Sequence, residues 1–241
     1  MRHCKWFVSV FLLAIIIGCE EKAPVAVAEA VVEDPYIYID STTQLKIYYP
    51  QFSRVDLVCG EMPPTSQTDI IMCCAAAFTG QKLETFSHDN IAGDHVADGV
   101  FYNGYACPSN TGTFVFYGDY WRFLPSCHSD SITKAADTGG MAFSQIMLVY
   151  DGRRCPCHVG GRNRFRALCE KDGMLCIAES KRLQDFEFFM RSLMDYGVTH
   201  AIYLQPGKGW NYSWYRDNAG MAHIMHPKVH DYSTNWITFY Y

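Results

Sequence analysis

The alternation of apolar and polar positions is most regular between residues 164 and 212. Residues 165–170 and 174–178 are apolar, β-rich runs that flank the pair Asp172-Gly173. An Asp-Gly pair between two such runs favours the positive φ angles of a tight hairpin turn. The pattern therefore predicts two antiparallel strands joined by a short turn.

A helix with one buried face is predicted directly after this hairpin. Gly197 stands where the C-terminal cap of a helix belongs, and residues 199–204 then form a short apolar run typical of a strand. That strand leads into a polar, Gly-rich turn at residues 205–209. The apolar positions that recur at helical spacing and define the buried face are Leu183, Phe186, Phe189, Met190 and Leu193.

The rest of the chain is mainly a series of predicted short strands separated by turns. Residues 131–144 have a weakly helical pattern, interrupted by Gly139-Gly140. Residues 69–78 are apolar but ambiguous, because Ile and Cys favour a buried strand whereas three alanines favour a helix. The segments predicted as strands are 44–49, 55–59, 113–117, 120–124, 145–150 and 234–241.

The 164–209 stretch resembles the phosphodiester glycosidases related to the lysosomal enzyme that uncovers mannose 6-phosphate. In that family a strand opening with Arg-Thr-Ala leads through Lys-Asp-Gly to a second strand, then to a helix ending in Gly and a strand ending in Leu-Asp-Gly-Gly-Gly-Ser. Arg164 takes the place of the family Arg, Lys171-Asp172-Gly173 matches the turn, and residues 204–209 take the place of the final motif. The resemblance implies an α+β domain with a mixed, mostly antiparallel sheet and few helices, covering residues 41–241.

Two other segments fit the same family frame. The family has a strand ending in Asn-Gly-Gly-Phe-Phe, and the counterpart here is Ala75-Ala76-Ala77-Phe78, which favours a strand over residues 69–78. Asn235 falls where the family has an Asn in its last strand.

Gln205 and Pro206 replace the Asp and the first Gly of the family's Gly-rich motif. An Asp at that turn can take a proton, whereas an amide has no proton to exchange near neutral pH. Proline also removes an N–H and fixes φ. The resemblance therefore implies a degenerate domain that binds or processes a glycan or glycosyl phosphate, with a binding or scaffolding protein that has lost the chemistry as the alternative.

Several residues are candidates for binding such a ligand. Arg164 offers a planar fork suited to phosphate, with a surface salt bridge as the competing interpretation. Lys208 adds a charge in the turn or is a solvated loop residue, and the aromatic residues that follow are either stacking platforms for sugar or core residues. The predicted substrate-binding residues are Arg164, Gln205, Gly207, Lys208, Trp210 and Asn235.

Acid–base chemistry without the family Asp would need other groups. Asp94, His95 and Asp98 form a polar cluster in a long loop with His88, and they are the predicted catalytic residues if the protein is an enzyme with a relocated acid. Turn formation is the competing explanation, particularly for Asp98, which precedes Gly99.

The sequence predicts no metal and no cofactor. His223, His226 and His230 have near-helical spacing, but Pro227 separates the second from the third. The motif Cys155-Pro156-Cys157-His158 is tighter than a CxxC pair and lacks a partner motif that would complete four zinc ligands. P-loop, HExxH and serine-elbow motifs are absent from the sequence.

The N-terminus has the pattern of a bacterial lipoprotein signal. Arg2 and Lys5 precede an apolar run that ends in Gly18-Cys19, which predicts a signal peptide over residues 1–18 and lipidation of Cys19. An uncleaved membrane anchor is the alternative. Residues 19–40 are predicted to be a flexible tether, and its acidic start is either a signal for export to the cell surface or an ordinary linker. We therefore expect an outer-membrane or cell-surface location.

Composition limits the remaining function classes. The chain has 241 residues, of which 49% are hydrophobic, so it can bury one sizeable core. The formal net charge of −5 becomes two units more negative without Arg2 and Lys5, which argues against a nucleic-acid role that rests on a basic surface. Cys107 and Cys127 flank the hairpin of residues 113–124 and are the best candidates for a disulfide.

Overall fold

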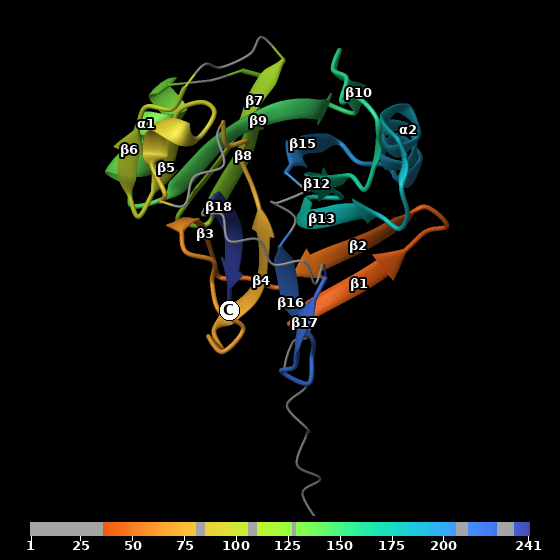
Figure 1. Cartoon of the computed structure of the whole chain (residues 1–241), viewed down its shortest axis with the longest axis horizontal. Coiled ribbons are helices and arrows are strands. Elements are labelled where there is room, and N and C mark those ends of the chain that lie inside the picture. The colour runs from red at the N-terminus through yellow and green to blue at the C-terminus, as the bar shows by residue number, and fades with distance from the viewer. Residues whose placement is uncertain (1–35, 81–84, 106–109, 127–128, 206–211, 226–233) are drawn as a thin grey trace, which may run out of the picture. The chain divides into compact units, whose positions relative to one another are not determined.

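The computed structural model describes residues 36–80, 85–105, 110–126, 129–205, 212–225 and 234–241. Two sheets and two α-helices account for most of this part of the chain (Figure 1). Neither α-helix is long and apolar enough to cross a membrane. Strand β1 begins at Ile37, so the last residues of the predicted tether 19–40 are part of a sheet.

The larger sheet, here called the main sheet, has 11 strands. Eight of these strands lie side by side in one antiparallel series. Strands β7 and β10 pair with β9 outside this series, and β8 pairs with β7. In order, the series contains β1 (Ile37–Ser41), β2 (Leu45–Pro50), β13 (Met174–Ser180), β12 (Arg166–Lys171), β15 (His200–Leu204), β9 (Met141–Tyr150), β5 (His95–Ala97) and β6 (Val100–Tyr102); the remaining strands are β7 (Thr111–Tyr117), β8 (Tyr120–Leu124) and β10 (Arg153–Arg154).

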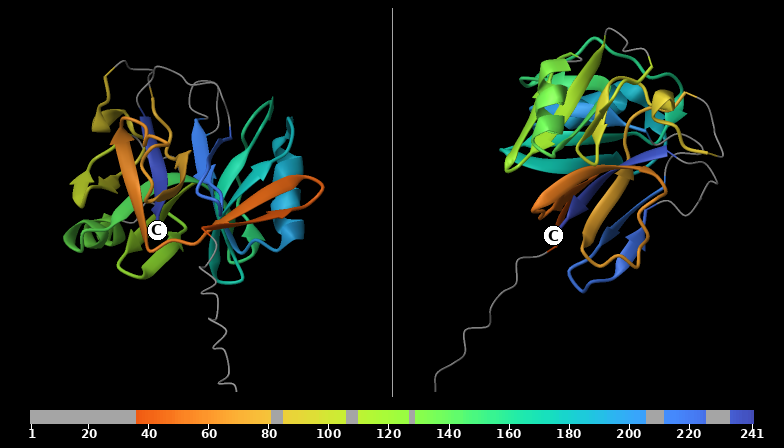
Figure 2. Two further views of the ribbon diagram at one scale, coloured as in Figure 1. Left: turned by 90° about the horizontal axis from the view of Figure 1, so that it is seen from below. Right: turned by 90° about the vertical axis from the view of Figure 1, so that its left-hand side faces the viewer.

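The second sheet has five antiparallel strands and is stacked against the main sheet (Figure 2). Its order is β17 (Ala222–Ile224), β16 (Ser213–Arg216), β4 (Ile70–Ala75), β18 (Thr234–Tyr240) and β3 (Arg54–Gly60). Two short strands, β11 (Arg162–Asn163) and β14 (Gln184–Asp185), form a separate pair, and a 3-10 turn, η1, covers His88–Asn90.

The hairpins predicted over residues 165–178 and 113–124 are confirmed. The first turns at an Asp-Gly pair, and so do two further hairpins. Both residues of each pair have positive φ, which suits the right-handed twist of the strands they join. In the turn between β12 and β13, Asp172 has φ 52° and Gly173 has φ 77°. This turn aligns Lys171 with Met174 and fixes the register of every pair further along the two strands. The other two pairs are Asp98-Gly99, between β5 and β6, and Asp151-Gly152, between β9 and β10.

Helix α2 (Phe186–Tyr196) confirms the predicted helix and its cap. Gly197 has φ 86°, and its N–H bonds back to the last turn, which is the left-handed cap that glycine favours. The buried side chains are Phe186, Phe189, Met190 and Leu193. Leu183 was wrongly placed on this face: it precedes the helix, in the short bend before β14, and is exposed.

Helix α1 (Ser129–Asp137) corrects the prediction over residues 131–144. The helix stops before Gly139, which has φ 69°, and β9 begins at Met141. Residues 141–144 are therefore strand, because the two glycines end the helix instead of interrupting it. Ile132 and Ala135 pack with Val96, Val115 and Ala142 against strands β5, β7 and β9.

The central core lies between the two sheets. Inward side chains of the main sheet, including Leu168, Ile177 and Ile202, share one cluster with Ile237 and Phe239 of the second sheet. Helix α2 covers the opposite face of the main sheet, where its apolar side chains pack with Ala167, Cys169, Cys176 and Ala178. The segment 69–78 is confirmed as mainly strand, since β4 is buried along its whole length between β16 and β18.

Candidate functional site

A buried ion pair lies on the inward face of the main sheet. Arg166 on β12 stands opposite Glu179 on β13 in the hairpin register. The arginine side chain is fully buried, and its Nε and Nη2 donate to Glu179 Oε2 at 2.9 and 2.5 Å. Burial opposes the charged form of Arg166, but the Glu179 carboxylate outweighs this effect and the pKa of the guanidinium is raised. Arg166 is therefore charged in the folded protein.

Two further basic residues lie beside this ion pair. Lys46 on β2 is the register partner of Glu179 on its other side, and its Nζ lies 5.0 Å from the ring centroid of Tyr48. Arg164 approaches Glu179 Oε1 at 3.9 Å and is about half exposed. Two arginines thus approach the Glu179 carboxylate, and Lys46 occupies the neighbouring position in the same cross-strand row. The local excess of positive charge favours an anion over a cation as ligand.

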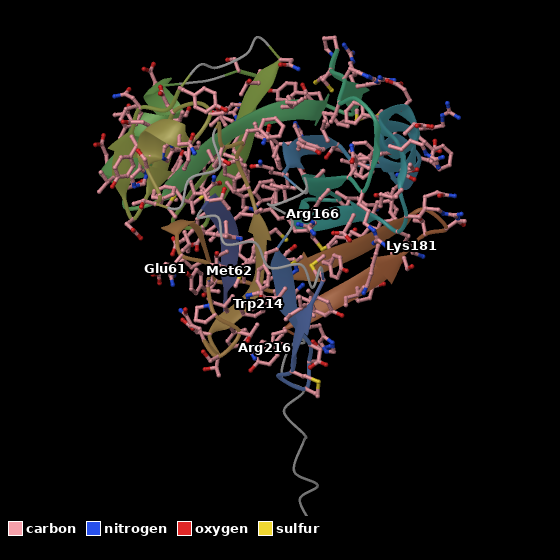
Figure 3. All side chains as sticks on the ribbon, in the orientation of Figure 1. Glu61, Met62, Arg166, Lys181, Trp214 and Arg216 are labelled. Carbon is pink, nitrogen blue, oxygen red and sulfur yellow. The ribbon has the colours of Figure 1, made fainter. Side chains whose placement is uncertain are left out.

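Arg166 points toward the second sheet (Figure 3). The Arg166 charge acts on Cys74 of β4, whose side chain shares the inward face with Ala76, although burial dominates and raises the pKa of the Cys74 thiol to about 11. Nη1 of Arg166 is buried and has no hydrogen-bond partner among the described residues. An unpaired donor of this kind is rare in folded proteins and is a feature expected of a ligand site.

Three buried amides gather where β4 ends. Asn235 accepts from the N–H of Ala77 at 2.8 Å and donates to its carbonyl at 3.2 Å. The backbone N–H of Gln205 donates to the carbonyl of Ala76, and so does the side chain of Gln145, at 3.1 and 3.4 Å. These contacts satisfy the backbone of residues 76 and 77 after the strand ladder stops. They also tie β4, β9, β15 and β18 together at one end of the two sheets.

The ion pair and the amides belong to one region, because Leu204 pairs with Arg166 and immediately precedes Gln205. Amide groups donate and accept hydrogen bonds, and the arginine supplies a fixed positive fork. This combination is suited to hydroxyl and phosphate oxygens. We call the region the inter-sheet polar site and define it as Lys46, Gln145, Arg166, Glu179, Gln205 and Asn235.

The predicted binding residues fall into two groups. Gln205 and Asn235 are buried in the inter-sheet polar site, and Arg164 reaches its edge through Glu179. Gly207, Lys208 and Trp210 lie outside the described residues, as do Cys19, Cys107, Cys127, His226 and His230, so those predictions remain as they stand.

The predicted catalytic cluster lies elsewhere in the main sheet. Strand β5, which carries His95, is separated from β12 by β9 and β15. Asp98 is the first residue of the Asp-Gly turn, with φ 51°, and Asp94 accepts weakly from the N–H of Gly104 at 3.4 Å. These residues do not meet Arg164 in one pocket. Their assignment as catalytic groups stays a prediction, and turn geometry accounts for the position of Asp98.

His95 is buried within a stack of rings. Its Nε2 lies 2.9 Å from Nδ1 of His88, and the His88 ring lies flat on Tyr102 with centroids 3.4 Å apart. Burial lowers the pKa of His95 to about 4, and the neighbouring His88 adds to this effect. His95 is therefore neutral near pH 7. In that form it can accept a proton only weakly, because protonation would place a charge in a buried site.

Arg166, Glu179, Lys46 and Gln145 were not predicted from the sequence. The predicted turn could have revealed Arg166 and Glu179. Once Lys171 pairs with Met174, the same antiparallel register pairs Arg166 with Glu179. Opposite charges at facing positions of two otherwise buried strands indicate a buried pair. Gln145 had no comparable signal, since its role depends on contact with β4, which is distant in the sequence.

The described part of the chain holds no group of three or more His, Cys, Asp or Glu side chains placed to bind a metal ion. His223, one of the sequence candidates, is instead paired with Asp217 Oδ2 at 2.6 Å. Cys155 and Cys157 are both free thiols within these residues.

Comparison with solved structures identifies the fold. The chain is similar to the catalytic domain of zebrafish N-acetylglucosamine-1-phosphodiester alpha-N-acetylglucosaminidase, auto-inhibited by its pro-peptide, with a TM-score of 0.59 and 12% identity over 89% of this chain and 85% of that one. A hypothetical protein from Synechocystis gives a TM-score of 0.45 at 9% identity, over 85% of this chain and 61% of that one. No family model matches the sequence, and no curated protein does. The chain therefore has a phosphodiester glycosidase-like fold, with mostly antiparallel sheets and two α-helices in the described part.

Proposed function

We propose that this protein is a bacterial cell-surface lipoprotein whose degenerate phosphodiester glycosidase-like domain binds a glycan or glycosyl phosphate in the inter-sheet polar site. The observation that carries the proposal is the placement of Arg164 and Arg166 at the carboxylate of Glu179, with Lys46 as its cross-strand neighbour. The fold likeness to an enzyme named for an N-acetylglucosamine 1-phosphodiester supports a ligand of this chemical class.

The phosphate group of the ligand would be held by the positive side chains. Arg166 cannot move freely, because two of its nitrogens are bonded to Glu179. Its Nη1 retains an unused donor as far as the described residues show. Lys46 is only partly buried, so it can reach a ligand from the solvent side. A fixed guanidinium with a more mobile ammonium is a combination well suited to phosphate oxygens.

Binding fits the site better than hydrolysis. The groups that bond to residues 76 and 77 at the end of β4 are the side-chain amides of Gln145 and Asn235 and the backbone N–H of Gln205, and amides do not exchange protons near neutral pH. Glu179 is the single carboxylate among the residues that define the inter-sheet polar site, and its negative charge is already neutralised by arginine. An acid for the leaving oxygen would have to come from another part of the chain.

A phosphodiester ligand tests the proposal directly. The methyl diester of N-acetylglucosamine 1-phosphate is titrated into the protein by calorimetry, and release of free sugar is followed in parallel. We expect binding without release. Lys46→Gln should weaken binding by about tenfold, the equivalent of ~1.4 kcal/mol. Lys134→Gln is the matched control, because its Nζ also lies over a tyrosine ring, at 5.4 Å from the Tyr117 centroid.

Three outcomes are distinguished by this experiment. Equal affinity of wild type and Lys46→Gln would overturn the assignment of the site. Sugar release that is lost in Asp94→Asn or His95→Gln would show an enzyme with a relocated acid. No binding by the wild type would favour the alternative, a scaffolding lipoprotein that keeps the fold without the ligand.

The membrane anchor is tested separately. We expect the full chain, expressed in a diderm bacterium and supplied with a labelled fatty acid, to carry the label and to fractionate with the outer membrane. Cys19→Ser should abolish both. A soluble, unlabelled wild-type protein would contradict the lipoprotein proposal without affecting the ligand-binding one.

A further inference from the structure

A cleft lies at the other end of β15 from the inter-sheet polar site. His200 is the first residue of this strand and Leu204 is the last. At about 3.3 Å per residue, the two ends are ~13 Å apart along the strand. The cleft has a volume of about 430 Å³ and is lined by side chains from β8, β9, β12 and β15. The apolar side chains of Leu168 and Ile202 lie between it and the inter-sheet polar site.

The polar side of the cleft is an imidazole held between two carboxylates. Nε2 of His200 lies 3.2 Å from Asp151 Oδ1, and Nδ1 lies 2.8 Å from Glu170 Oε2. The second approach is close, but Nδ1 makes no proper hydrogen bond to that carboxylate. The side chain of Asp151 is 71% exposed and that of Glu170 is 23% exposed. Both carboxylates therefore keep oxygen atoms that can accept hydrogen bonds from a ligand.

The other side of the cleft is aromatic. The Phe123 ring stacks on His200 at 5.8 Å, and the Tyr150 ring meets His200 edge-on at 5.1 Å. Trp121 packs edge-on against Phe123 at 6.1 Å. Trp121 and Tyr150 are only partly buried, so part of each ring faces solvent. These contacts hold the rings in fixed positions before any ligand arrives, which reduces the entropy cost of binding.

We propose that this cleft binds a neutral pyranose unit of a glycan, as a second site separate from the inter-sheet polar site. Sugar hydroxyls donate to carboxylate oxygens, while the C–H face of the ring packs on an aromatic side chain. The lining also holds one guanidinium, that of the exposed Arg122, so the positive charge of the lining does not exceed the negative charge of the two carboxylates. The two ends of β15 therefore differ in chemistry: the inter-sheet polar site suits an anion, and the cleft suits a neutral polyol. A concave site with aromatic walls and a few fixed polar groups is typical of small-ligand recognition.

The test uses three neutral trisaccharides as probes: chitotriose, cellotriose and maltotriose. Each is titrated into the wild-type protein, with affinity measured by calorimetry and ring contact by saturation-transfer NMR. We expect at least one to bind and Trp121→Ala to weaken it by about tenfold or more. Tyr120→Ala is the matched control, because Tyr120 is the adjacent aromatic residue, is exposed, and lies on the opposite face of the same strand.

Asp151→Asn is a second variant that keeps the fold. Asp151 has φ 49°, and asparagine is among the few residues that tolerate this conformation. The Asp151→Asn variant should weaken trisaccharide binding by about threefold to tenfold, because one charged acceptor is lost. Lys46→Gln should leave trisaccharide binding unchanged, which separates this proposal from the one for the inter-sheet polar site.

The proposal is overturned if none of the three sugars binds the wild type, or if Trp121→Ala and Asp151→Asn both bind as tightly as the wild type. It is also overturned if Tyr120→Ala or Lys46→Gln weakens binding as strongly as Trp121→Ala does.

Discussion

The fully buried guanidinium of Arg166 is held by two hydrogen bonds to one oxygen of Glu179, across the hairpin of β12 and β13. This pair places a fixed charge between the two sheets at the point where the strand ladder of β4 ends. Because the pair is buried, each partner depends on the other for its stability, and this dependence can be measured.

Removing one partner should be far more costly than removing both. Arg166→Met or Glu179→Leu alone should lower the free energy of unfolding by about 3–5 kcal/mol, since an unpaired charge remains buried. The double variant should lose much less than the sum of the two. Urea denaturation measures all three. Arg164→Ala is the control, expected to cost about 0–1 kcal/mol because Arg164 is about half exposed and 3.9 Å from its partner. Additive losses would contradict a coupled pair.

Asn235 should be important for stability because it substitutes for missing backbone partners. Asn235→Ala leaves the N–H and carbonyl of Ala77 without their side-chain bonds in a buried position. We expect a loss of about 1–3 kcal/mol in the free energy of unfolding. Asn163→Ala should change little, since Asn163 is exposed and its side chain makes one bond, to Gly160 at 3.3 Å. Comparable losses in the two variants would count against the role of Asn235.

The buried His95 should make folding stability depend on pH. Burial, with a smaller contribution from His88, lowers its pKa to about 4, below the ordinary value near 6.5, while Asp94 and the carbonyl of Gly93 oppose the shift. Between these values the unfolded chain binds a proton that the folded protein does not, so stability falls as pH drops from about 6.5 to 4. Over this pH range the free energy of unfolding should fall by as much as ~3 kcal/mol.

Chemical denaturation at intervals from pH 7.5 to 4 tests this dependence. His95→Gln should flatten the wild-type slope in that window. An identical slope in wild type and His95→Gln would show that other groups cause the pH dependence.

The thiols of the core should resist alkylation until the protein unfolds. Burial raises the pKa of Cys157 to about 11 and that of Cys59 to about 12, and it raises those of Cys73 and Cys169 well above the usual value. The reactive thiolate is therefore scarce at pH 8. Mass spectrometry after iodoacetamide treatment should find these cysteines unmodified in the native protein and modified in urea. Rapid native labelling of Cys73 or Cys169 would show that the core opens locally.

The glycosidase-like fold could be predicted from the sequence because the patterns that indicate it involve neighbouring residues. The Asp172-Gly173 turn, the helical spacing up to Leu193 and the cap at Gly197 each involve neighbouring residues, and the structure has all three. Errors arose where two local signals competed. Leu183 fits the helical spacing, but the short strand β14 precedes α2 and takes it out of the helix.

The candidate site could be predicted from the sequence only in part, because most of its contacts join residues that are distant in the chain. Gln205 and Asn235 were predicted through the family resemblance, and the turn register could have revealed Arg166 and Glu179. Their meeting with Lys46 and Gln145 depends on how strands from distant parts of the chain pair and stack.

The sequence by itself therefore determined most of the strands, their turns, helix α2 and its cap, because spacing and turn chemistry act over a few residues, whereas β1, β16 and β17 were not predicted. Only the tertiary structure decided which polar side chains meet. The main sheet places β2, β13, β12 and β15 side by side, so that two arginines meet one carboxylate beside Lys46 at one end and an imidazole lies between two carboxylates at the other. Both arrangements depend on strand pairing over long sequence separations, which no local pattern specifies.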